Sequence, residues 1–203
     1  MQDLSSPTAR RADDAALDLI FREARTHHAW SPTPVSEEIL REIYDLAKLG
    51  PTALNCGPLR IVFLVSKESR KRLLPAIIPD NLEKVREAPV SALFAYDTEF
   101  FRNLPRLMPF YDVGNLFESR PELAEQVALV NCTLQAAYFL MAARALGVDC
   151  APIGGFEADR INAEFFPDGK LKINFVCNLG YGKPEAIGPR LPRLGFDEAC
   201  RIQ

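Results

Sequence analysis

The residues best suited to bind a charged ligand are arginines near the two ends of the chain. Arg25 is followed by Thr26 and His27 where the first predicted helix closes. A guanidinium and an imidazole at this point could donate to a phosphate dianion, which arginine binds through two parallel hydrogen bonds. The same basic residues could instead complement the carbonyl end of the helix dipole. Arg190 and Arg193 offer further guanidiniums near the C-terminus, where simple surface exposure is the alternative.

A polar turn at 50–58 separates a predicted helix from a predicted strand. Thr and Asn near the mouth of an interior strand can hydrogen-bond the edge of a flat heterocycle. The alternative is that the turn only ends the helix. Its candidate contacts are Pro51, Thr52, Ala53 and Asn55.

A second turn, at 152–156, follows the longest predicted helix. Its paired glycines allow a backbone N–H to approach a planar ligand closely, although such pairs also mark ordinary tight turns. Its candidate contacts are Pro152, Ile153, Gly154 and Gly155. The remaining polar cluster, Asn81 and Lys84, indicates by residue type alone a solvated helix face, because Lys is nearly always exposed.

The common catalytic motifs are missing from the sequence. It contains no G-x-x-x-x-G-K-[ST] phosphate loop and no G-x-S-x-G nucleophile turn. Gly180-x-Gly182 follows a predicted strand, but the following Lys183-Pro184 prevents the helix that a dinucleotide-binding turn requires. The only two histidines are adjacent, so we expect no metal site. Cys56 has no base nearby in sequence and is interpreted as a packing thiol.

Hydrophobic periodicity predicts the elements that position these turns. Helices are expected over 12–25, from a Ser36 cap to the Gly50-Pro51 stop, over 67–74, over 80–87, and over 121–146 with Gly147 closing the last. Strands are expected over 61–65, 90–96 and 171–179, the first two as interior strands. The aromatic segment 97–120 lacks periodicity and is expected to be a functional loop or lid. Helices outnumber strands without strict alternation, which favours an α+β fold.

Composition limits the class of protein. The 203 residues are 48% hydrophobic, which is enough for one sizeable core, so we expect a flexible lead-in over 1–12 and a single domain over 13–203. A net charge of -3 gives no reason to expect nucleic acid as a partner. No uninterrupted apolar stretch approaches 18 residues, so no membrane partner is expected. The five cysteines are odd in number and without C-x-x-C spacing, which favours reduced, buried thiols in the cytoplasm.

In this order, the five polar segments resemble the FMN-dependent nitroreductase family. That family has a basic R-x-S stretch, a P-S-x-x-N-x-Q-P turn before a strand, an N-x-x-K pair, a P-x-x-G-F turn after a long helix, and a terminal Arg or Lys. The resemblance covers the chain from about residue 25 to 193. It implies a nitroreductase-like α+β fold, with a mainly antiparallel central sheet flanked by helices, in an intertwined homodimer.

The resemblance also implies roles for the matched residues. Arg25 and Arg190 would bind the phosphate of FMN, with His27 where the family more often has Ser and Arg193 as a secondary candidate. Thr26 lies within the same stretch.

At the flavin ring, Asn81 and Lys84 would address the pyrimidine edge. Gly154 and Gly155 would present N–H groups near N5 and O4, with 152–153 packing on the ring. The turn 51–55 would lie against the flavin held mainly by the other subunit. Flavin N5 would carry the hydride from NADH or NADPH, so no catalytic side chain is implied.

More closely, the sequence resembles the malonic semialdehyde reductases of pyrimidine utilisation. This likeness implies reduction of a short aldehyde acid to 3-hydroxypropionate. The substrate carboxylate would need a cation, and Arg60, Arg102 and Arg106 are all available. The resembling stretches are Ala24-Arg25-Thr26-His27, Gly50-Pro51-Thr52, Arg60-Ile61-Val62-Phe63, Arg190-Leu191-Pro192-Arg193 and Phe196-x-Glu198-Ala199-Cys200.

Other functions stay open at this point. Gly57 stands where the family usually has Gln, and the acceptor could be a nitroaromatic compound or a quinone. A flavin-binding module without turnover, and an interaction protein without cofactor, are the alternatives from other functional classes.

Overall fold

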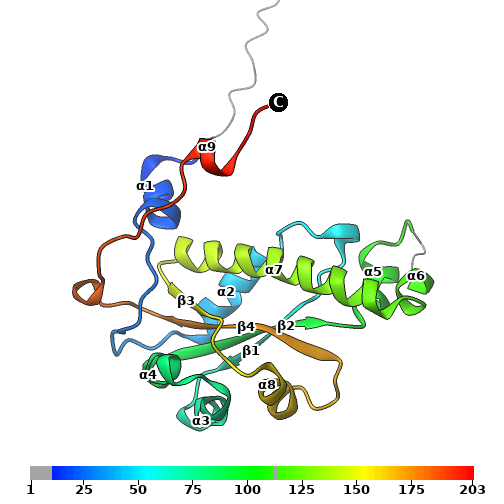
Figure 1. Ribbon diagram of the computed structural model, residues 1–203, viewed down its shortest axis with the longest axis horizontal. Helices are drawn as coiled ribbons and strands as arrows, with labels where there is room; N and C mark the ends of the chain where they lie inside the picture. The colour runs from blue at the N-terminus through cyan, green and yellow to red at the C-terminus, as the bar shows by residue number, and fades with distance from the viewer. Residues whose placement is uncertain (1–10, 112–113) are drawn as a thin grey trace, which may run out of the picture.

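A four-stranded antiparallel sheet forms the centre of the computed structural model, which describes residues 11–111 and 114–203 (Figure 1). The strands are β1 (Leu59–Leu64), β2 (Val90–Asp97), β3 (Asp149–Ile153) and β4 (Leu171–Gly180), in the order β1-β2-β4-β3. All three neighbouring pairs are antiparallel. This confirms the α+β class and the antiparallel sheet. The expected lead-in over 1–12 lies almost wholly outside the described residues.

Helices cover both faces of the sheet (Figure 1). On one face lie α2 (Glu37–Ala47) and α7 (Pro121–Ala145), which contact each other. On the other lie α3 (Lys67–Leu73), α4 (Pro79–Glu87) and α8 (Ala158–Phe165). The sheet is therefore the middle of three layers, with a core on each side.

Strand β2 supplies side chains to both cores. Ala92, Phe94 and Tyr96 pack in the core with α2 and α7, whereas Leu93 and Ala95 pack in the core on the opposite face. Successive side chains of a strand point to opposite faces. This alternation explains why β2 is apolar at every position from 90 to 96 except Ser91.

Short helical turns complete the described chain. Near the N-terminus, α1 (Asp14–Leu17) continues into the π-helical turn η1 (Asp18–Arg22). The others are η2 (Ala53–Asn55), η3 (Leu74–Ala76), η4 (Phe100–Asn103), α5 (Leu104–Leu107), α6 (Gly114–Glu118), η5 (Pro184–Ala186) and α9 (Phe196–Ala199).

Helix boundaries follow the sequence signals closely. The Ser36 hydroxyl accepts from the N–H of Ile39 at 3.3 Å and so caps α2. Pro121 is the first residue of α7, and Gly147 follows that helix with a φ of 74°. A left-handed residue after a helix end favours glycine. The first helix differs from expectation, because regular helical structure ends at Arg22 and does not reach Arg25.

Three other expectations were wrong. Strand β1 is an edge strand whose middle side chains are half-buried, not an interior strand. The segment 97–120 is not irregular, because η4, α5 and α6 occupy most of its described part, and Phe100 and Phe117 are buried; its functional role stays a prediction. The predicted turn at 152–156 begins inside β3, which holds Pro152 and Ile153. Proline is tolerated there because β3 is the other edge strand.

Helix α7 is long and apolar enough to cross a bilayer by length and composition alone. Its packing shows a different role, because it contacts all four strands and α2. It is the central helix of one core. The terminal segments carrying α1 and α9 stand apart from the sheet beside one end of α7 (Figure 1).

Candidate functional site

Arg25 and Arg190, far apart in sequence, belong to two segments that lie side by side. Arg25 Nη2 donates to the carbonyl of Gly188 at 2.6 Å. Arg190 Nη2 donates to the carbonyls of Arg22 and Ala24, at 2.6 and 2.9 Å. Within the described ranges, neither guanidinium pairs with a carboxylate. Two uncompensated cations therefore meet at the junction of the terminal segments, where an anion would be stabilised.

His27, adjacent to this junction, is buried in a different setting. Its Nε2 lies 3.5 Å from Asp149 Oδ1, and the other oxygen of Asp149 accepts from the N–H of Gly182 at 2.8 Å. A Cβ on Gly182 would lie only 2.0 Å from His27 Nδ1, so the ring packs directly on that backbone. Nδ1 is buried and has no hydrogen-bond partner among the described residues. The imidazole therefore packs against Asp149 and Gly182 and does not lie with the guanidiniums of Arg25 and Arg190.

The other residues predicted to bind phosphate are Arg193 and Thr26. Arg193 is exposed and donates to the carbonyls of Leu191 and Pro192 in its own segment. Thr26 is exposed. The structure therefore brings Arg25 and Arg190 together and leaves Arg193 on the surface.

Asn81, Lys84 and Gly155 form a second cluster. Lys84 Nζ donates to Asn81 Oδ1 at 2.9 Å along α4. A Cβ on Gly155 would lie 2.5 Å from Asn81 Nδ2 and 2.4 Å from Ile78 Cδ1, so only glycine allows this close approach. The N–H of Ile78 also donates to the Gly155 carbonyl at 3.3 Å. The start of α4 and the glycine turn are thus held together.

Lys84 carries the free positive charge of this cluster. Its side chain is half-buried and pairs with no carboxylate in the part of the chain that the structure describes. Its backbone carbonyl accepts from Asn178 Nδ2 at 2.8 Å, which ties α4 to β4. Burial lowers the pKa of His28, and the positive charge of Lys84 lowers it further. The Lys84 ammonium group and the His28 imidazole are therefore neighbours.

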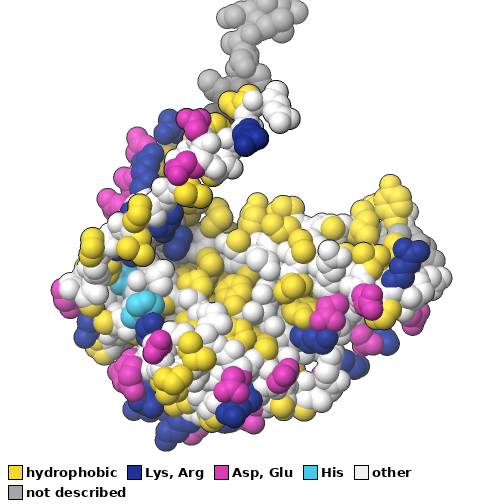
Figure 2. Space-filling view, viewed as in Figure 1, with side chains coloured by type: hydrophobic (Ala, Val, Ile, Leu, Met, Phe, Trp, Pro, Cys, Tyr) yellow, Lys and Arg dark blue, Asp and Glu magenta, His cyan; other side chains and the backbone are white. Residues whose placement is uncertain are grey.

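The glycine turn offers backbone donors beside this cation. Apart from strand pairing, neither the N–H of Gly154 nor that of Gly155 donates a hydrogen bond to any acceptor among residues 11–111 and 114–203. A Cβ on Gly154 would meet nothing within 4 Å, so the backbone there is open. Figure 2 shows the molecule hollowed between the arm made by the terminal segments and the body, with hydrophobic side chains lining much of the hollow. Unpaired donors and a cation fit a ligand that is apolar on its faces and rich in acceptors at its edge.

The polar turn 51–55 lies elsewhere. The N–H of Ala53 donates to Asn131 Oδ1 of α7 at 2.7 Å, and Asn55 Nδ2 donates to the carbonyl of Leu107 in α5 at 2.9 Å. Thr52 Oγ1 accepts from the N–H of Gly57 at 3.2 Å. The turn is therefore fixed on α7 and α5, apart from the Lys84 cluster. One chain does not bring all the predicted contacts together.

Two polar residues that the sequence reasoning missed position this turn. Asn131 and Gln135 are buried side chains one helical turn apart on the otherwise apolar α7. Gln135 Oε1 accepts from the N–H of Leu59 at 3.0 Å, as Asn131 does from that of Ala53. An amide pair at i and i+4 among alanines was the available signal.

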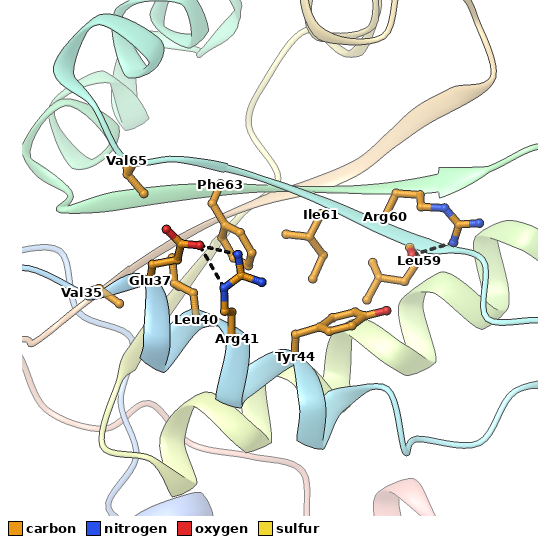
Figure 3. A pocket seen from close by; sticks show the side chains of 10 residues that line it. All are labelled: Val35, Glu37, Leu40, Arg41, Tyr44, Leu59, Arg60, Ile61, Phe63 and Val65. Atoms are coloured by element: carbon orange, nitrogen blue, oxygen red, sulfur yellow. Dashed lines mark hydrogen bonds and ion pairs between the residues drawn. The ribbon is translucent and has the colours of Figure 1, made fainter.

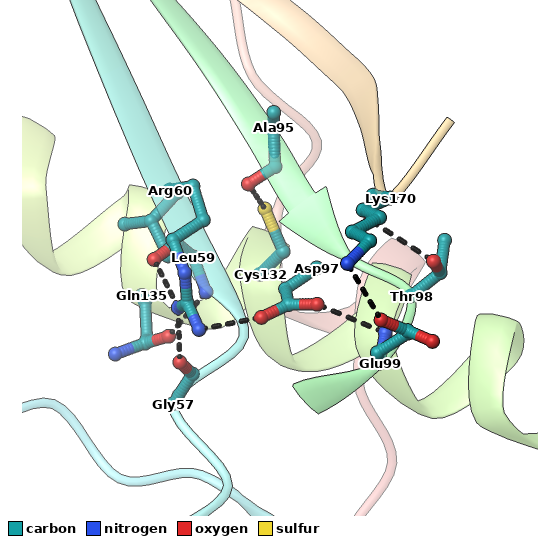
Figure 4. A network of polar contacts seen from close by, with 10 residues as sticks. All are labelled: Gly57, Leu59, Arg60, Ala95, Asp97, Thr98, Glu99, Cys132, Gln135 and Lys170. Atoms are coloured by element: carbon teal, nitrogen blue, oxygen red, sulfur yellow. Dashed lines mark hydrogen bonds and ion pairs between the residues drawn. The ribbon is translucent and has the colours of Figure 1, made fainter. Parts of the chain in front are cut away.

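Next to the turn, Arg60 is fully engaged with protein acceptors (Figure 4). Nη2 donates to Asp97 Oδ2 at 2.6 Å, and Nη1 donates to the carbonyls of Gly57 and Leu59, both at 2.9 Å. The other oxygen of Asp97 accepts from the N–H of Glu99 at 2.9 Å. Arg60 therefore links the turn to the end of β2.

Most of the cysteines are buried. Cys56, Cys132, Cys150 and Cys177 are free and buried, whereas Cys200 is exposed, against the expectation that the thiols are buried. Burial raises the pKa of Cys56 to about 11. Burial raises the pKa of Cys132 to the same value, so these two thiols are protonated at neutral pH.

Comparison with known proteins places this geometry in a family. The model of the Nitroreductase family matches residues 21–181. A protein of Polynucleobacter asymbioticus, provisionally named NADH dehydrogenase/NAD(P)H nitroreductase, is 49% identical over 94% of this chain and 97% of its own length. A protein of the same provisional name from Ralstonia nicotianae is 48% identical, with the same coverage of both chains. A nitroreductase structure from Exiguobacterium sibiricum in complex with FMN superimposes with a TM-score of 0.82 at 20% identity, over 97% of this chain and all of the other.

Proposed function

Since this chain belongs to the nitroreductase family of flavin-dependent NAD(P)H oxidoreductases, which use FMN, we propose that it reduces malonic semialdehyde to 3-hydroxypropionate. The aldehyde carbon would gain a hydride that originates from NAD(P)H, its oxygen would gain a proton from water, and NAD(P)⁺ would leave. Bound FMN supplies the hydride relay at N5. The end-to-end likeness of the sequence to malonic semialdehyde reductases supports the choice of substrate.

One observation carries the proposed cofactor site: a cation, an amide and two free backbone donors meet where α4 approaches the glycine turn. Lys84 has no carboxylate partner among the described residues, and its Nζ is held 2.9 Å from Asn81 Oδ1. Reduced flavin carries negative charge on its pyrimidine edge, and a preorganised cation stabilises charge at that position. Lys84 and Asn81 would hold this edge, and the N–H groups of Gly154 and Gly155 would orient N5.

Arg25 and Arg190 would hold the phosphate. Neither guanidinium pairs with a carboxylate in the described part of the chain, and their backbone hydrogen bonds fix the two segments that carry them. A phosphate dianion accepts charge-assisted hydrogen bonds from such groups. His27 is left out of this set, because its ring is buried against Gly182.

We further propose that the active species is a homodimer. The outer face of α7 exposes apolar side chains, which gather on the surface shown in Figure 2. Contiguous exposed apolar patches mark interaction sites. A second chain would cover this face and bring its own 51–55 turn to the flavin. The large apolar residues exposed on α7 are Leu129, Val130, Leu134 and Tyr138.

Two further surfaces are left open by a single chain. An apolar cavity of about 620 Å³ lies between α2 and the edge strand β1 (Figure 3). The C-terminal tail projects from the body with Leu191, Leu194, Phe196 and Ile202 exposed (Figure 1). Both are surfaces that a partner chain would cover. Free, mostly buried thiols suit the reducing cytoplasm, where we propose that the dimer works.

The test is anaerobic reduction of the FMN-loaded protein by NADH or NADPH, followed by mixing with acceptors. We expect the flavin absorbance to bleach and then to return faster with malonic semialdehyde than with a nitrofuran. The names of the relatives favour a second candidate, nitroaromatic reduction, which the reverse order would support. A protein that binds FMN and never bleaches would be a flavin-binding module. Sedimentation of a Leu134→Glu variant as a monomer, with lost FMN, would support the dimer.

A further inference from the structure

A second cavity, of about 570 Å³, lies beside the 51–55 turn. Its walls come from the end of α2, the segment 50–60, α5 and α7. A volume of this size is typical of small-molecule sites. Its charged and amide side chains are Lys48, Arg60, Arg106, Asn55, Asn103 and Gln135, and none of the lining residues is acidic. We call it the Arg106 pocket.

Only one of the three cations lacks a partner among the residues that the structure describes. Arg60 donates to Asp97 and to two carbonyls. Lys48 pairs with Asp45 at 2.5 Å on the solvent side. Arg106 makes no ion pair and no side-chain hydrogen bond to any residue within 11–111 or 114–203. Its guanidinium is therefore available to an anion.

An amide donor also faces the pocket. Gln135 is only 8% exposed, and its Oε1 must face Leu59 because it accepts that residue's N–H. Its Nε2 therefore turns away, as Figure 4 shows, and finds no acceptor among the described residues. It lies 3.9 Å from where a Cβ on Gly57 would be, which places it at the pocket wall. Nε2 is not among the buried polar atoms that lack a partner, so it is accessible from the pocket, where a ligand oxygen could accept its hydrogen bond.

We propose that Arg106 and Gln135 bind the substrate carboxylate, so that the Arg106 pocket selects short anionic aldehydes over neutral ones. The proposal rests on the proposed function, and it chooses among the three arginines that sequence left open. Arg102 is paired with Glu99 at 2.7 Å and lines no wall of the pocket. Thr52 and Asn55 belong both to the pocket and to the turn that would face the flavin. The carboxylate would thus be held beside the reacting centre of the assembled dimer.

The test compares Arg106→Gln with Arg102→Gln, a control on the neighbouring exposed arginine, in the FMN-loaded dimer. For Arg106→Gln we expect kcat/KM for malonic semialdehyde to fall roughly 10- to 100-fold, as for loss of a charge-assisted hydrogen bond. The kcat/KM for propanal, which lacks the carboxylate, should stay unchanged. The rate at which NADPH bleaches the flavin absorbance should also stay unchanged. Arg106→Lys should recover part of the loss. Arg102→Gln should behave as the wild type.

Binding of malonate, measured by calorimetry, gives a readout independent of turnover. Arg106→Gln should raise its Kd by a similar factor. Gln135→Glu keeps an acceptor for the Leu59 N–H but turns a carboxylate oxygen toward the pocket, so it should also weaken malonate binding.

The proposal is overturned if Arg106→Gln lowers kcat/KM equally for propanal, or if it slows flavin bleaching by NADPH instead. It is also overturned if the Kd for malonate is the same in the wild type and in both variants. The second of these outcomes would assign the pocket to the phosphates of the dinucleotide. If the wild type binds malonate through Arg106 but never reduces malonic semialdehyde, the proposed substrate fails and the anion site stands.

Discussion

Adding a single carbon atom at Gly155 tests whether the α4 cluster holds the flavin. In Gly155→Ala the new Cβ would lie 2.4 Å from Ile78 Cδ1 and 2.5 Å from Asn81 Nδ2, whereas ordinary contact begins near 3.4 Å. These side chains must therefore move by about 1 Å, the difference between those distances. Both obstructing atoms are the ends of flexible side chains, so we expect the fold to survive.

The displaced amide should weaken FMN binding by a calculable amount. Asn81 would lose its alignment with Lys84 Nζ, now 2.9 Å from its Oδ1, and with the edge of the flavin. A neutral hydrogen bond contributes about 0.5–1.5 kcal/mol, which corresponds to a roughly 2- to 12-fold increase in the Kd for FMN. We expect this weaker binding because the substitution moves the Asn81 amide, which the cofactor would contact.

The assay is titration of the apoprotein with FMN, followed by quenching of flavin fluorescence. Gly195→Ala is the control, because it lies outside the cluster and a Cβ there would meet only Glu198 Oε2 at 3.4 Å, an ordinary contact. If Gly155→Ala binds FMN as tightly as the wild type, or if Gly195→Ala is equally weakened while both variants keep their Tm, the assignment of the cluster to the flavin edge is wrong.

Three other changes test separate parts of the structure. Lys84→Met should lower the flavin reduction potential in a spectroscopic titration, because it removes the cation that stabilises the reduced ring; an unchanged potential would contradict this. Arg190→Gln should raise the Kd for FMN by roughly 10- to 150-fold but leave that for riboflavin, which lacks the phosphate, unaltered; an equal loss for both would point to a structural role. At pH 8, iodoacetamide should label Cys200 first in mass spectrometry, because burial raises the pKa of Cys56 and Cys132 to about 11. Because these pKa values are raised in the folded state, the free energy of unfolding should fall as the pH rises from ~8.5 to about 11. Rapid labelling of Cys132 would show that this thiol is not buried.

Local signals in the sequence were sufficient for most helices and for three strands. The Ser36 cap, Pro121 and Gly147 act on the backbone within a few residues, so their effect can be predicted without the fold. Strand β3 was missed because its Pro152 argues against a strand. Proline fits there only because β3 lies at the edge, and strand order is a property of the whole sheet.

The site was predictable only in its parts. The types and order of Arg25, Asn81, Lys84 and Gly155 suggested a flavin ligand set, and the structure does place Asn81 against Gly155. Sequence could not show that Gln135 turns its amide toward Leu59, 76 positions away. Nor could it distinguish Arg106 from Arg102, because the difference is whether Glu99 lies beside the guanidinium.

The separation of the 51–55 turn from the Lys84 cluster has a genetic consequence. If each flavin rests on one chain's α4 and the other chain's turn, two different defective alleles can rescue each other. A chain substituted at Arg190 and a chain substituted at Asn55 would together form hybrid dimers. In each hybrid dimer, one of the two flavin sites would be built only from unsubstituted residues. Co-expression of two inactive versions should then return up to half of the normal turnover per hybrid.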